Sequence, residues 1–297
     1  MGTSLDIFVP YWGDPDYMRL TIESVLAQTD SRWFLTVIDD AYPDPTIEQF
    51  VAGIADPRIT YVKKPENEGI TASFRTSVRL ATQDLLAVVG CDDVLFPNYV
   101  ETILQAHEAH PDADIIQPGV QVIDAAGRPV DTLADTVKQK LLRPKSSQPI
   151  LLSGEKLATS LLHGDWLYWP SLTFRTASIR TVEFRDEFLI IQDLALIMDM
   201  ILQGSSLLVV PTESFAYRRH AESASSTLIL GGSRFSGERE YFALAASLAH
   251  IRGWRKAEIA ARLRLTSRAH ALALLPAILK NRDGSGFRLM IRHGLGA

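Results

Sequence analysis

The sequence of 297 residues lacks the features that mark secreted, membrane-spanning or nucleic-acid-binding proteins. Its one cysteine, Cys91, excludes an intrachain disulfide and fits a reducing cytosol. No run approaches the roughly 18 uninterrupted apolar residues of a membrane span. The start has neither the basic nor the long apolar region of a secretory signal. The net charge of -5 argues against a dedicated nucleic-acid binder. We therefore expect a cytoplasmic protein that binds no nucleic acid.

The sequence does have the composition of an ordinary globular domain, with 46% hydrophobic and 22% charged residues. Short apolar segments alternate with helical patterns through the first hundred residues. We expect strands at 5–10, 34–39, 59–62 and 85–91, with helices at 17–28, 46–54 and 71–81 between them. Strands separated by such helices form βαβ units, and nearly continuous apolar strands fit a sheet covered on both faces. The sequence thus predicts an α/β fold with a mostly parallel central sheet flanked by helices.

The alternation is less regular after residue 97. We expect helices at 98–110, 154–162 and 193–203, and strands at 115–119, 121–124, 172–175, 207–211 and 214–217. Residues 125–149 are polar and read as a long excursion over the surface. Residues 220–237 are rich in Ser and Gly and are predicted to be flexible. From residue 238 onward the pattern is helical.

Two acidic pairs follow predicted strands, Asp39-Asp40 after the second and Asp92-Asp93 after the fourth. Ligands of parallel α/β sheets bind at the carboxyl ends of the strands, so these carboxylates should meet at one edge. They repel each other unless a cation compensates, and Mg²⁺ prefers carboxylates together with ligand phosphates. A metal-bound phosphate compound is one interpretation. The other is that Asp39 and Asp92 cap the helices that follow.

An ordered series of short motifs resembles glycosyltransferase family 2. The series consists of Asp6-Ile-Phe-Val-Pro10-Tyr, Val37-Ile-Asp39-Asp40, Asn67-Glu-Gly69, Asp92-Asp93-Val-Leu-Phe-Pro97, Gln192-Asp193 and Tyr217-Arg-Arg-His220. The resemblance covers residues 5 to about 225. It implies the GT-A fold and an inverting transferase that uses a nucleotide-sugar donor and a divalent cation, Mg²⁺ or Mn²⁺. Sugars or lipid-linked glycans are the implied acceptors, in the synthesis of cell-surface polysaccharide, glycan or glycolipid.

The resemblance also implies roles for individual residues. Asp193 falls where the family has its catalytic base, and Asp93 and His220 fall at the metal. The donor-binding positions are Pro10, Tyr11, Asp39, Asp40, Asn67, Arg75 and Asp92. We further expect the aromatic residues Trp166, Tyr168 and Trp169 to stack on an acceptor sugar, or else to be part of the core. Asp193 is also placed as an ordinary cap of the helix that follows it.

Three positions depart from the family pattern. Gly90 stands where the family often has the first Asp of its metal motif, and Gln192 stands where Glu usually precedes the base. The family's arginine position holds Phe74, and Arg75 comes one residue later. One residue turns a helix by about 100°, so Arg75 need not reach the same phosphate.

These departures leave a catalytically inactive nucleotide-sugar-binding subunit as an alternative. A sugar nucleotidyltransferase is a further alternative, but that class has a Gly-rich loop with a basic residue after the first strand. Here Pro10–Pro15 holds one glycine and no basic residue.

The resemblance and the charge pattern together suggest how the chain is organised. We expect a nucleotide-sugar-binding half at 1–96, an acceptor-binding and catalytic half at 97–222, a lid or linker at 223–237 and a helical extension at 238–297. Residues 250–297 carry ten Lys and Arg against two acids, so their net charge is +8, while the rest of the chain carries -13. Basic amphipathic helices favour anionic membrane surfaces. The extension is therefore predicted to bind the inner face of the plasma membrane, or to dock on the acidic core or in a homodimer.

Overall fold

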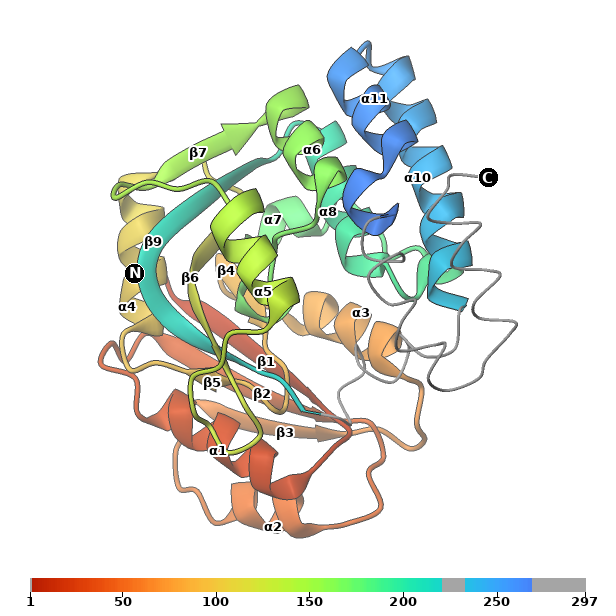
Figure 1. Cartoon of the computed structure of the whole chain (residues 1–297). Coiled ribbons are helices and arrows are strands. Elements are labelled where there is room, and N and C mark those ends of the chain that lie inside the picture. Colours follow the sequence, from red (N-terminus) through yellow and green to blue (C-terminus); the bar gives the residue numbers. More distant parts are fainter. Residues whose placement is uncertain (1, 221–232, 269–297) are drawn as a thin grey trace.

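The computed structural model describes residues 2–220 and 233–268, and in this part of the chain the centre is a nine-stranded mixed sheet (Figure 1). The strands are β1 (Leu5–Tyr11), β2 (Trp33–Asp39), β3 (Ile59–Lys63), β4 (Leu85–Val88), β5 (Val94–Leu95), β6 (Ile115–Ile123), β7 (Ile150–Ser153), β8 (Thr173–Arg175) and β9 (Ser206–Arg218). Their order is β3-β2-β1-β4-β8-β6-β9-β5, and β7 also pairs with β9.

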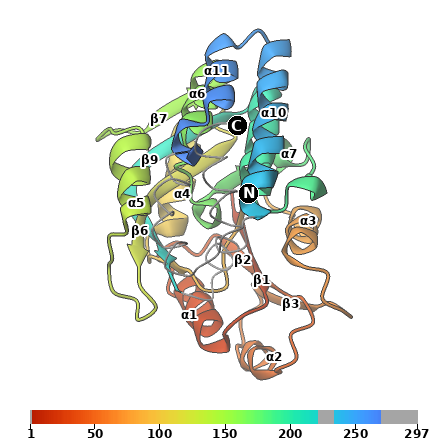
Figure 2. The same cartoon turned by 45° about the vertical axis from the view of Figure 1, so that its right-hand side comes forward.

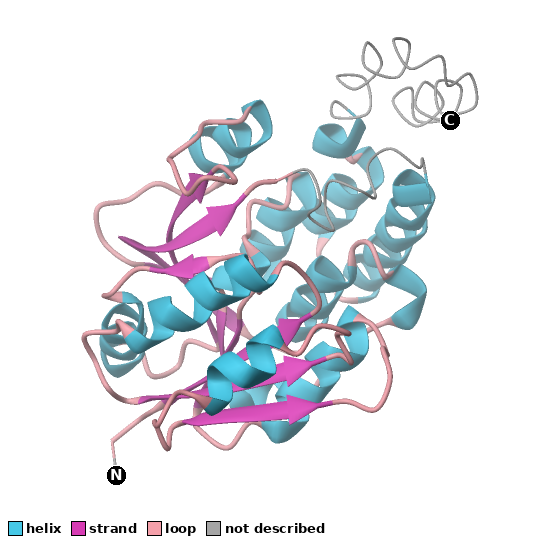
Figure 3. Ribbon diagram, turned by 90° about the horizontal axis from the view of Figure 1, so that it is seen from below, coloured by secondary structure: helices cyan, strands magenta, loops and turns pink. Residues whose placement is uncertain are grey.

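The first four long strands form the parallel half of the sheet that the sequence predicts. β1 pairs in parallel with β2 and β4, and β3 extends the sheet beyond β2. Figure 3 shows these strands running side by side with helices on both sides. The register places Tyr11 of β1 beside Asp39 of β2, so the residues that end these strands lie at one edge. Beyond β4 the sheet is mixed, because β8 runs antiparallel to both β4 and β6.

Two hydrophobic clusters cover the two faces of the sheet. α1 (Pro15–Leu26), α2 (Thr46–Ala52) and α4 (Tyr99–Ala109) cover one face. α3 (Ile70–Leu80), α6 (Gly154–His163), α8 (Gln192–Leu202), α10 (Ser233–Ile251) and α11 (Arg255–Leu263) cover the other face. Neighbouring residues of one strand divide between the clusters: Leu85 and Ala87 face the first, whereas Leu86 and Val88 face the second. This division explains the continuous apolar pattern of the strands.

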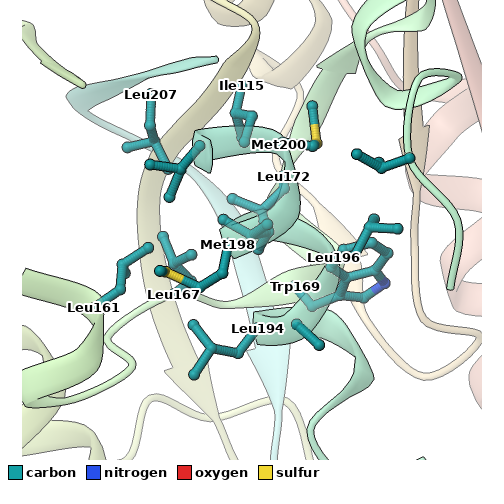
Figure 4. Packing of buried hydrophobic residues seen from close by; sticks show 14 of the residues in the cluster. Ile115, Leu161, Leu167, Trp169, Leu172, Leu194, Leu196, Met198, Met200 and Leu207 are labelled. Carbon is teal, nitrogen blue, oxygen red and sulfur yellow. The ribbon is translucent and has the colours of Figure 1, made fainter. Parts of the chain in front are cut away.

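The helix that carries the predicted base in its first turn, α8, is apolar on almost every side. Figure 4 shows Leu194, Leu196, Met198 and Met200 pointing in different directions into the cluster, to which Trp169 also belongs. A helix that is hydrophobic all round must be buried. Packing therefore holds α8 firmly, and with it the residues at its N-terminus.

The second half of the chain differs from the sequence prediction in its segmentation. The strands expected at 115–119 and 121–124 form one strand, β6, and those expected at 207–211 and 214–217 form β9. β6 and β9 pair with each other along most of their length, with an irregular register near Gly119. This pairing keeps each backbone extended where the apolar pattern of the sequence is interrupted. The fourth strand, β4, ends at Val88 rather than at Cys91.

The polar excursion at 125–149 contains structure that the sequence did not reveal. It forms α5 (Leu133–Val137) and a π-helical turn, η1 (Lys138–Leu142). Asp135 is only 2% exposed, because tertiary hydrogen bonds compensate its burial. The remaining short elements are α7 (Thr176–Ile179) and the 3₁₀ turns η2 (Trp169–Ser171) and η3 (Asp186–Phe188).

The described part of the C-terminal extension packs into the core. Tyr241, Phe242 and Ala246 of α10 and Ala257 of α11 belong to the same cluster as α6 and α8. α10 already begins at Ser233, within the segment expected to be flexible, and the rest of the expected lid at 223–232 lies outside the described residues. No helix in the two described ranges is long and apolar enough to cross a membrane.

Candidate active site

Several of the residues predicted to bind the donor lie at or just after the carboxyl ends of β1, β2 and β4. Tyr11 ends β1 and is fully buried, and its ring centroid lies 4.9 Å from that of Tyr42. Asp39 ends β2 and is also fully buried. Its carboxylate accepts hydrogen bonds from the Tyr42 backbone N–H at 2.7 Å and from the Tyr61 hydroxyl at 2.5 Å. Asp39 therefore connects the loop that follows β2, through Tyr42, to the neighbouring strand β3, through Tyr61.

Asp40 organises the loop that precedes α3. Its two carboxylate oxygens accept the backbone N–H groups of Glu68 at 3.1 Å and of Gly69 at 2.8 Å. Lys64 lies against it, with Nζ 2.9 Å from Asp40 Oδ1 and 2.8 Å from the hydroxyl of Ser73. Gly69 has φ of +85°, a conformation that favours glycine. The Asn67-Glu-Gly69 motif is thus fixed to the end of β2.

Asp92 and Asp93 form a tight turn after β4. A Cβ at Gly90 would lie 2.6 Å from Asp93 Oδ2 and 2.8 Å from Asp92 Oδ1. Real Cβ atoms do not approach other heavy atoms so closely, so any other residue at position 90 would displace the two carboxylates from these positions.

Arg218, at the end of β9, donates hydrogen bonds to this turn. Its backbone N–H donates to Asp93 Oδ1 at 2.9 Å, and its Nε donates to the Asp92 carbonyl at 2.7 Å. Two residues later, His220 Nε2 lies 2.7 Å from Asp92 Oδ2. His220 therefore lies at the acidic pair, although 128 residues separate it from Asp92, and its metal-binding role stays a prediction.

The chemistry of this corner suits a hard cation. Asp93 is 1% exposed, and its Oδ2 has no hydrogen-bond partner. Burial, and then the charge of Asp92, raise the pKa of Asp93 well above its ordinary value. Among the described residues no three His, Cys, Asp or Glu side chains group closely enough to form a metal site alone. Since Mg²⁺ keeps several water and phosphate ligands, one or two carboxylates are enough on the protein side.

Asp193 lies in the first turn of α8. One of its oxygens accepts the backbone N–H of Leu194 at 2.8 Å. Burial, followed by repulsion from Asp165, raises the pKa of Asp193 to about 6. Lys138 of η1 is also close enough to act on this pKa, in the lowering direction. A carboxyl group with a pKa near the working pH is suited to proton transfer.

The segment around Asp165 is connected to η1. Asp165 Oδ1 accepts the backbone N–H of Leu167 at 3.0 Å, and the Leu167 carbonyl accepts a hydrogen bond from Lys138 Nζ at 3.1 Å. These contacts hold a second carboxylate and a cation beside the predicted base.

Phe74 and Arg75, which stand at and after the family's arginine position, both contact other parts of the protein. Phe74 packs into an aromatic cluster, with its ring centroid 5.4 Å from that of Trp169 and 5.6 Å from that of Phe184. Arg75 turns to the outer side of α3, where it donates to the Phe184 carbonyl at 2.9 Å and to Asp186 at 2.7 Å. In this structure Arg75 therefore pairs within the protein, and its donor-binding role stays a prediction.

The three aromatic residues proposed for the acceptor pack in the protein interior. Trp166 is fully buried, and its indole N–H donates to Ser160 Oγ at 3.1 Å. Tyr168 and Trp169 are 3% and 8% exposed. Of the two interpretations of these residues, the structure favours the core, and their acceptor role stays a prediction.

Tyr168 takes part in a polar network with Asp135. Its hydroxyl donates to Asp135 Oδ1 at 2.9 Å, and Arg219 donates to both oxygens of the same carboxylate at 2.8 and 3.1 Å. Burial alone would raise the pKa of Asp135, but the hydrogen bonds from Arg219 and Thr132 outweigh it and keep the pKa below its ordinary value. The network joins the excursion at 125–149 to the end of β9, one residue before His220.

Sequence reasoning missed several residues of this site, namely Lys64, Asp165, Lys138 and Asp135, and it named Arg218 only as part of the Tyr217-Arg-Arg-His220 motif. Lys64 comes directly after β3, at the same sheet edge as the acidic pairs, and this position was a signal that could have been used. The others lie in loops or at long range, so that only tertiary contacts show their place. Trp12 was missed as well; it is 52% exposed, and its ring meets that of Tyr42 edge-on at 5.4 Å.

Comparison with known proteins agrees with this arrangement. Residues 6–149 match the model of the family described as glycosyl transferase family 2. The matched segment, just under half of the chain, belongs to glycosyltransferase family 2. The matched segment contains β1 to β6 and both acidic pairs, and it ends before Asp193 and His220.

Two relatives illustrate the range of this family. The chain is 30% identical over 105 residues to WcaA of Escherichia coli, provisionally named a colanic acid biosynthesis glycosyl transferase. It is 32% identical over 129 residues to EpsE of Bacillus subtilis, provisionally named a glycosyltransferase. The matches cover 35% and 42% of this chain and only 37% and 46% of the relatives, so the chain spans less than half of their length.

The structural likeness is broader than the likeness in sequence. The crystal structure of residues 1–349 of TarS from S. aureus, in complex with UDP-GlcNAc, matches with a TM-score of 0.65 at 13% identity. The match covers 99% of this chain and 92% of that one. At such low identity it shows the fold alone, and the fold is the GT-A type that the sequence predicts.

Proposed function

We propose that this protein is an inverting glycosyltransferase that moves a sugar from a nucleoside-diphosphate donor to an acceptor hydroxyl. The observation that carries the proposal is Asp193, a carboxyl group with a pKa of about 6 at the start of a rigid buried helix. The residue before it, Gln192, is hydrogen-bonded to Thr71 at the start of α3, next to the loop that Asp40 holds. In the proposal, Asp193 supplies the base and the acidic pair Asp92-Asp93 lies on the side of the leaving diphosphate.

In this reaction the acceptor oxygen attacks the anomeric carbon while the bond from that carbon to the diphosphate breaks. Asp193 takes the proton of the acceptor hydroxyl, and the nucleoside diphosphate leaves with the bonding electrons. Proton removal by a positioned carboxylate typically supplies about 10²–10⁴-fold in rate. The packing of α8 fixes Asp193, and Asp165 keeps it basic.

The donor would bind along the carboxyl ends of β1, β2 and β4. In the proposal, Tyr11 and Asp39 border the nucleotide base, and the loop fixed by Asp40 closes that side. A divalent cation, Mg²⁺ or Mn²⁺, would be held by Asp93 with help from Asp92 and His220, and would neutralise charge on the leaving diphosphate. The unpartnered Asp93 Oδ2 is the structural feature that supports this part.

The relatives suggest the class of product. The name of WcaA refers to colanic acid, a polysaccharide, and the TarS structure contains UDP-GlcNAc. We therefore propose a UDP-sugar donor and a growing or lipid-linked glycan as the acceptor. A panel of nucleotide sugars, with and without Mn²⁺, tests the donor, because specific binding raises Tm by mass action.

An Asp193→Asn variant tests the assignment of the base. We expect it to bind the donor with unchanged affinity and to lose about 10²–10⁴-fold in turnover, measured as release of nucleoside diphosphate. Asp112→Asn is the matched control, because Asp112 is exposed on the turn between α4 and β6. Equal turnover in wild type and Asp193→Asn would show that the base is another residue.

The same experiment separates the enzyme from an inactive nucleotide-sugar-binding subunit. Phe74, in place of the family's arginine, is the observation that favours the inactive protein. Such a protein would show metal-dependent thermal stabilisation by the donor but no release of nucleoside diphosphate with any acceptor.

A further inference from the structure

The short helix α11 buries its small apolar residues and exposes its large ones. Its buried face consists of Ala257, Ala260 and Ala261, which are at most 1% exposed. Its larger apolar side chains point outward instead: Ile259 is 47% exposed and Leu263 is 41% exposed. A helix that served only to cover the core would bury its large apolar residues, since each gains about 1.5–3 kcal/mol on burial.

The exposed apolar surface continues beyond both ends of α11. Ile251, at the end of α10, is 80% exposed, and Leu265 is 52% exposed. Figures 1 and 2 both show α11 at the end of the molecule far from α2, with its outer side uncovered by other described elements. Four large apolar side chains are thus exposed along α11 and next to its two ends. We call Ile251, Ile259, Leu263 and Leu265 the apolar tip.

Cations surround the apolar tip. Arg255 and Lys256 in the first turn of α11 and Arg262 in its last turn are all exposed. Glu258 is the one acidic residue of α11, and it is held by His250 at 3.0 Å and by Arg262 at 2.7 Å. The tip therefore combines apolar side chains with a net positive charge, on a chain whose first 249 residues carry -13.

Charge decides which occupant fits this surface. The chain's own residues 269–297 contain four Lys and Arg against one acid, so they would add to the positive charge rather than neutralise it. A second copy docked by a two-fold axis would bring Arg255, Lys256 and Arg262 close to their own counterparts, and like charges repel. An anionic lipid surface neutralises the cations and also accepts the apolar side chains.

We propose that the apolar tip and the cations of α11 form a docking surface for an anionic lipid bilayer. Ile259 and Leu263 would enter the boundary between headgroups and acyl chains, while Arg255, Lys256 and Arg262 contact lipid phosphates. The proposal does not depend on the catalytic activity, because its readout is binding to vesicles.

Vesicle flotation of the full-length protein tests the proposal. We expect wild type to float with vesicles of phosphatidylcholine and phosphatidylglycerol, and not with phosphatidylcholine alone. Each cation at an anionic surface strengthens binding about fivefold, so Arg255→Glu/Lys256→Glu should weaken it at least about 25-fold. Ile259→Glu/Leu263→Glu should abolish flotation, and high salt should weaken that of wild type.

The control is Leu20→Glu on α1, because Leu20 is 45% exposed and lies away from α11. It should float like wild type, and all variants should keep the Tm and circular dichroism spectrum of wild type. The proposal is overturned if wild type does not float, or if Ile259→Glu/Leu263→Glu floats unchanged. It is also overturned if light scattering shows a dimer that these substitutions dissociate while vesicles bind none of the proteins.

Discussion

The hydroxyl of Thr71 donates a buried hydrogen bond of 2.6 Å to Oε1 of Gln192, across 121 residues of sequence. Thr71 lies in the first turn of α3, directly after the loop that Asp40 holds. Gln192 is the first residue of α8 and precedes Asp193. The bond therefore joins the start of α3, next to the loop that Asp40 holds, to the helix that carries the predicted base. The Gln192 amide oxygen accepts this bond as a neutral group.

Breaking the bond between Thr71 and Gln192 should destabilise the protein. Thr71→Val leaves the buried Gln192 amide oxygen without its donor, at a cost of about 1–3 kcal/mol in the free energy of unfolding. Gln192→Leu should cost a similar amount, and the double variant should cost less than the sum, with a coupling of about 0.5 kcal/mol or more. Urea denaturation of the four proteins measures this coupling. Additive costs would mean that the two side chains do not interact in solution.

The rate of transfer should follow the ionisation of Asp193. The base must be deprotonated to accept a proton, and burial together with Asp165 raises its pKa to about 6. We therefore expect kcat to rise about tenfold per pH unit below this pKa and to level off above it. Asp165→Asn removes the repulsion, so it should move the midpoint to lower pH, whereas Asp112→Asn should leave it unchanged. A midpoint that stays in place or moves upward in Asp165→Asn would contradict this electrostatic coupling.

Adding a single methyl group at Gly90 should disturb the acidic corner. The new Cβ would lie 2.6 Å from Asp93 Oδ2, so the carboxylates must move apart. We expect Gly90→Ala to lower stability by about 1–3 kcal/mol and to weaken the thermal stabilisation by donor and Mn²⁺. Gly237→Ala is the opposite control, because nothing lies within 4 Å of its Cβ and alanine favours a helix. Wild-type donor binding by Gly90→Ala would show that the corner adapts easily.

Neutralising Asp135 should loosen the excursion at 125–149. Asp135→Asn removes the charge that Arg219 and the Tyr168 hydroxyl contact, and we expect a loss of about 1–3 kcal/mol in stability. Because hydrogen bonds keep the pKa of Asp135 below its ordinary value, the wild-type advantage over the variant should hold at neutral pH and shrink as the pH falls through that lowered pKa. Asp131→Asn is the control, since its contact with Lys140 is long, at 3.7 Å, and exposed. Equal Tm values for all three proteins at neutral pH would rule out a structural role for the network.

Sequence periodicity predicted the first half of the fold well, because its elements form from local patterns. Strands such as β1 and β2 are continuous apolar runs, and the helices between them have regular apolar faces. The acidic pairs directly follow these strands, so their place at the sheet edge could be predicted as well, while their role in binding stays a prediction. The predictions failed where long-range pairing overrides local pattern. β6 and β9 are continuous because each supports the other, and Asp135 is buried because Arg219 and Tyr168 reach it.

The sequence by itself determined the parallel half of the sheet and the carboxylates at its edge, since hydrophobic period and strand ends are local properties. It also determined the basic character of the C-terminal region. Only the tertiary structure decided the surroundings of each charge. It placed Asp165 beside Asp193, turned Arg75 away to Asp186, and put large apolar side chains on the outside of α11. Such contacts join residues far apart in the chain, and the energy of a buried charge depends on those neighbours.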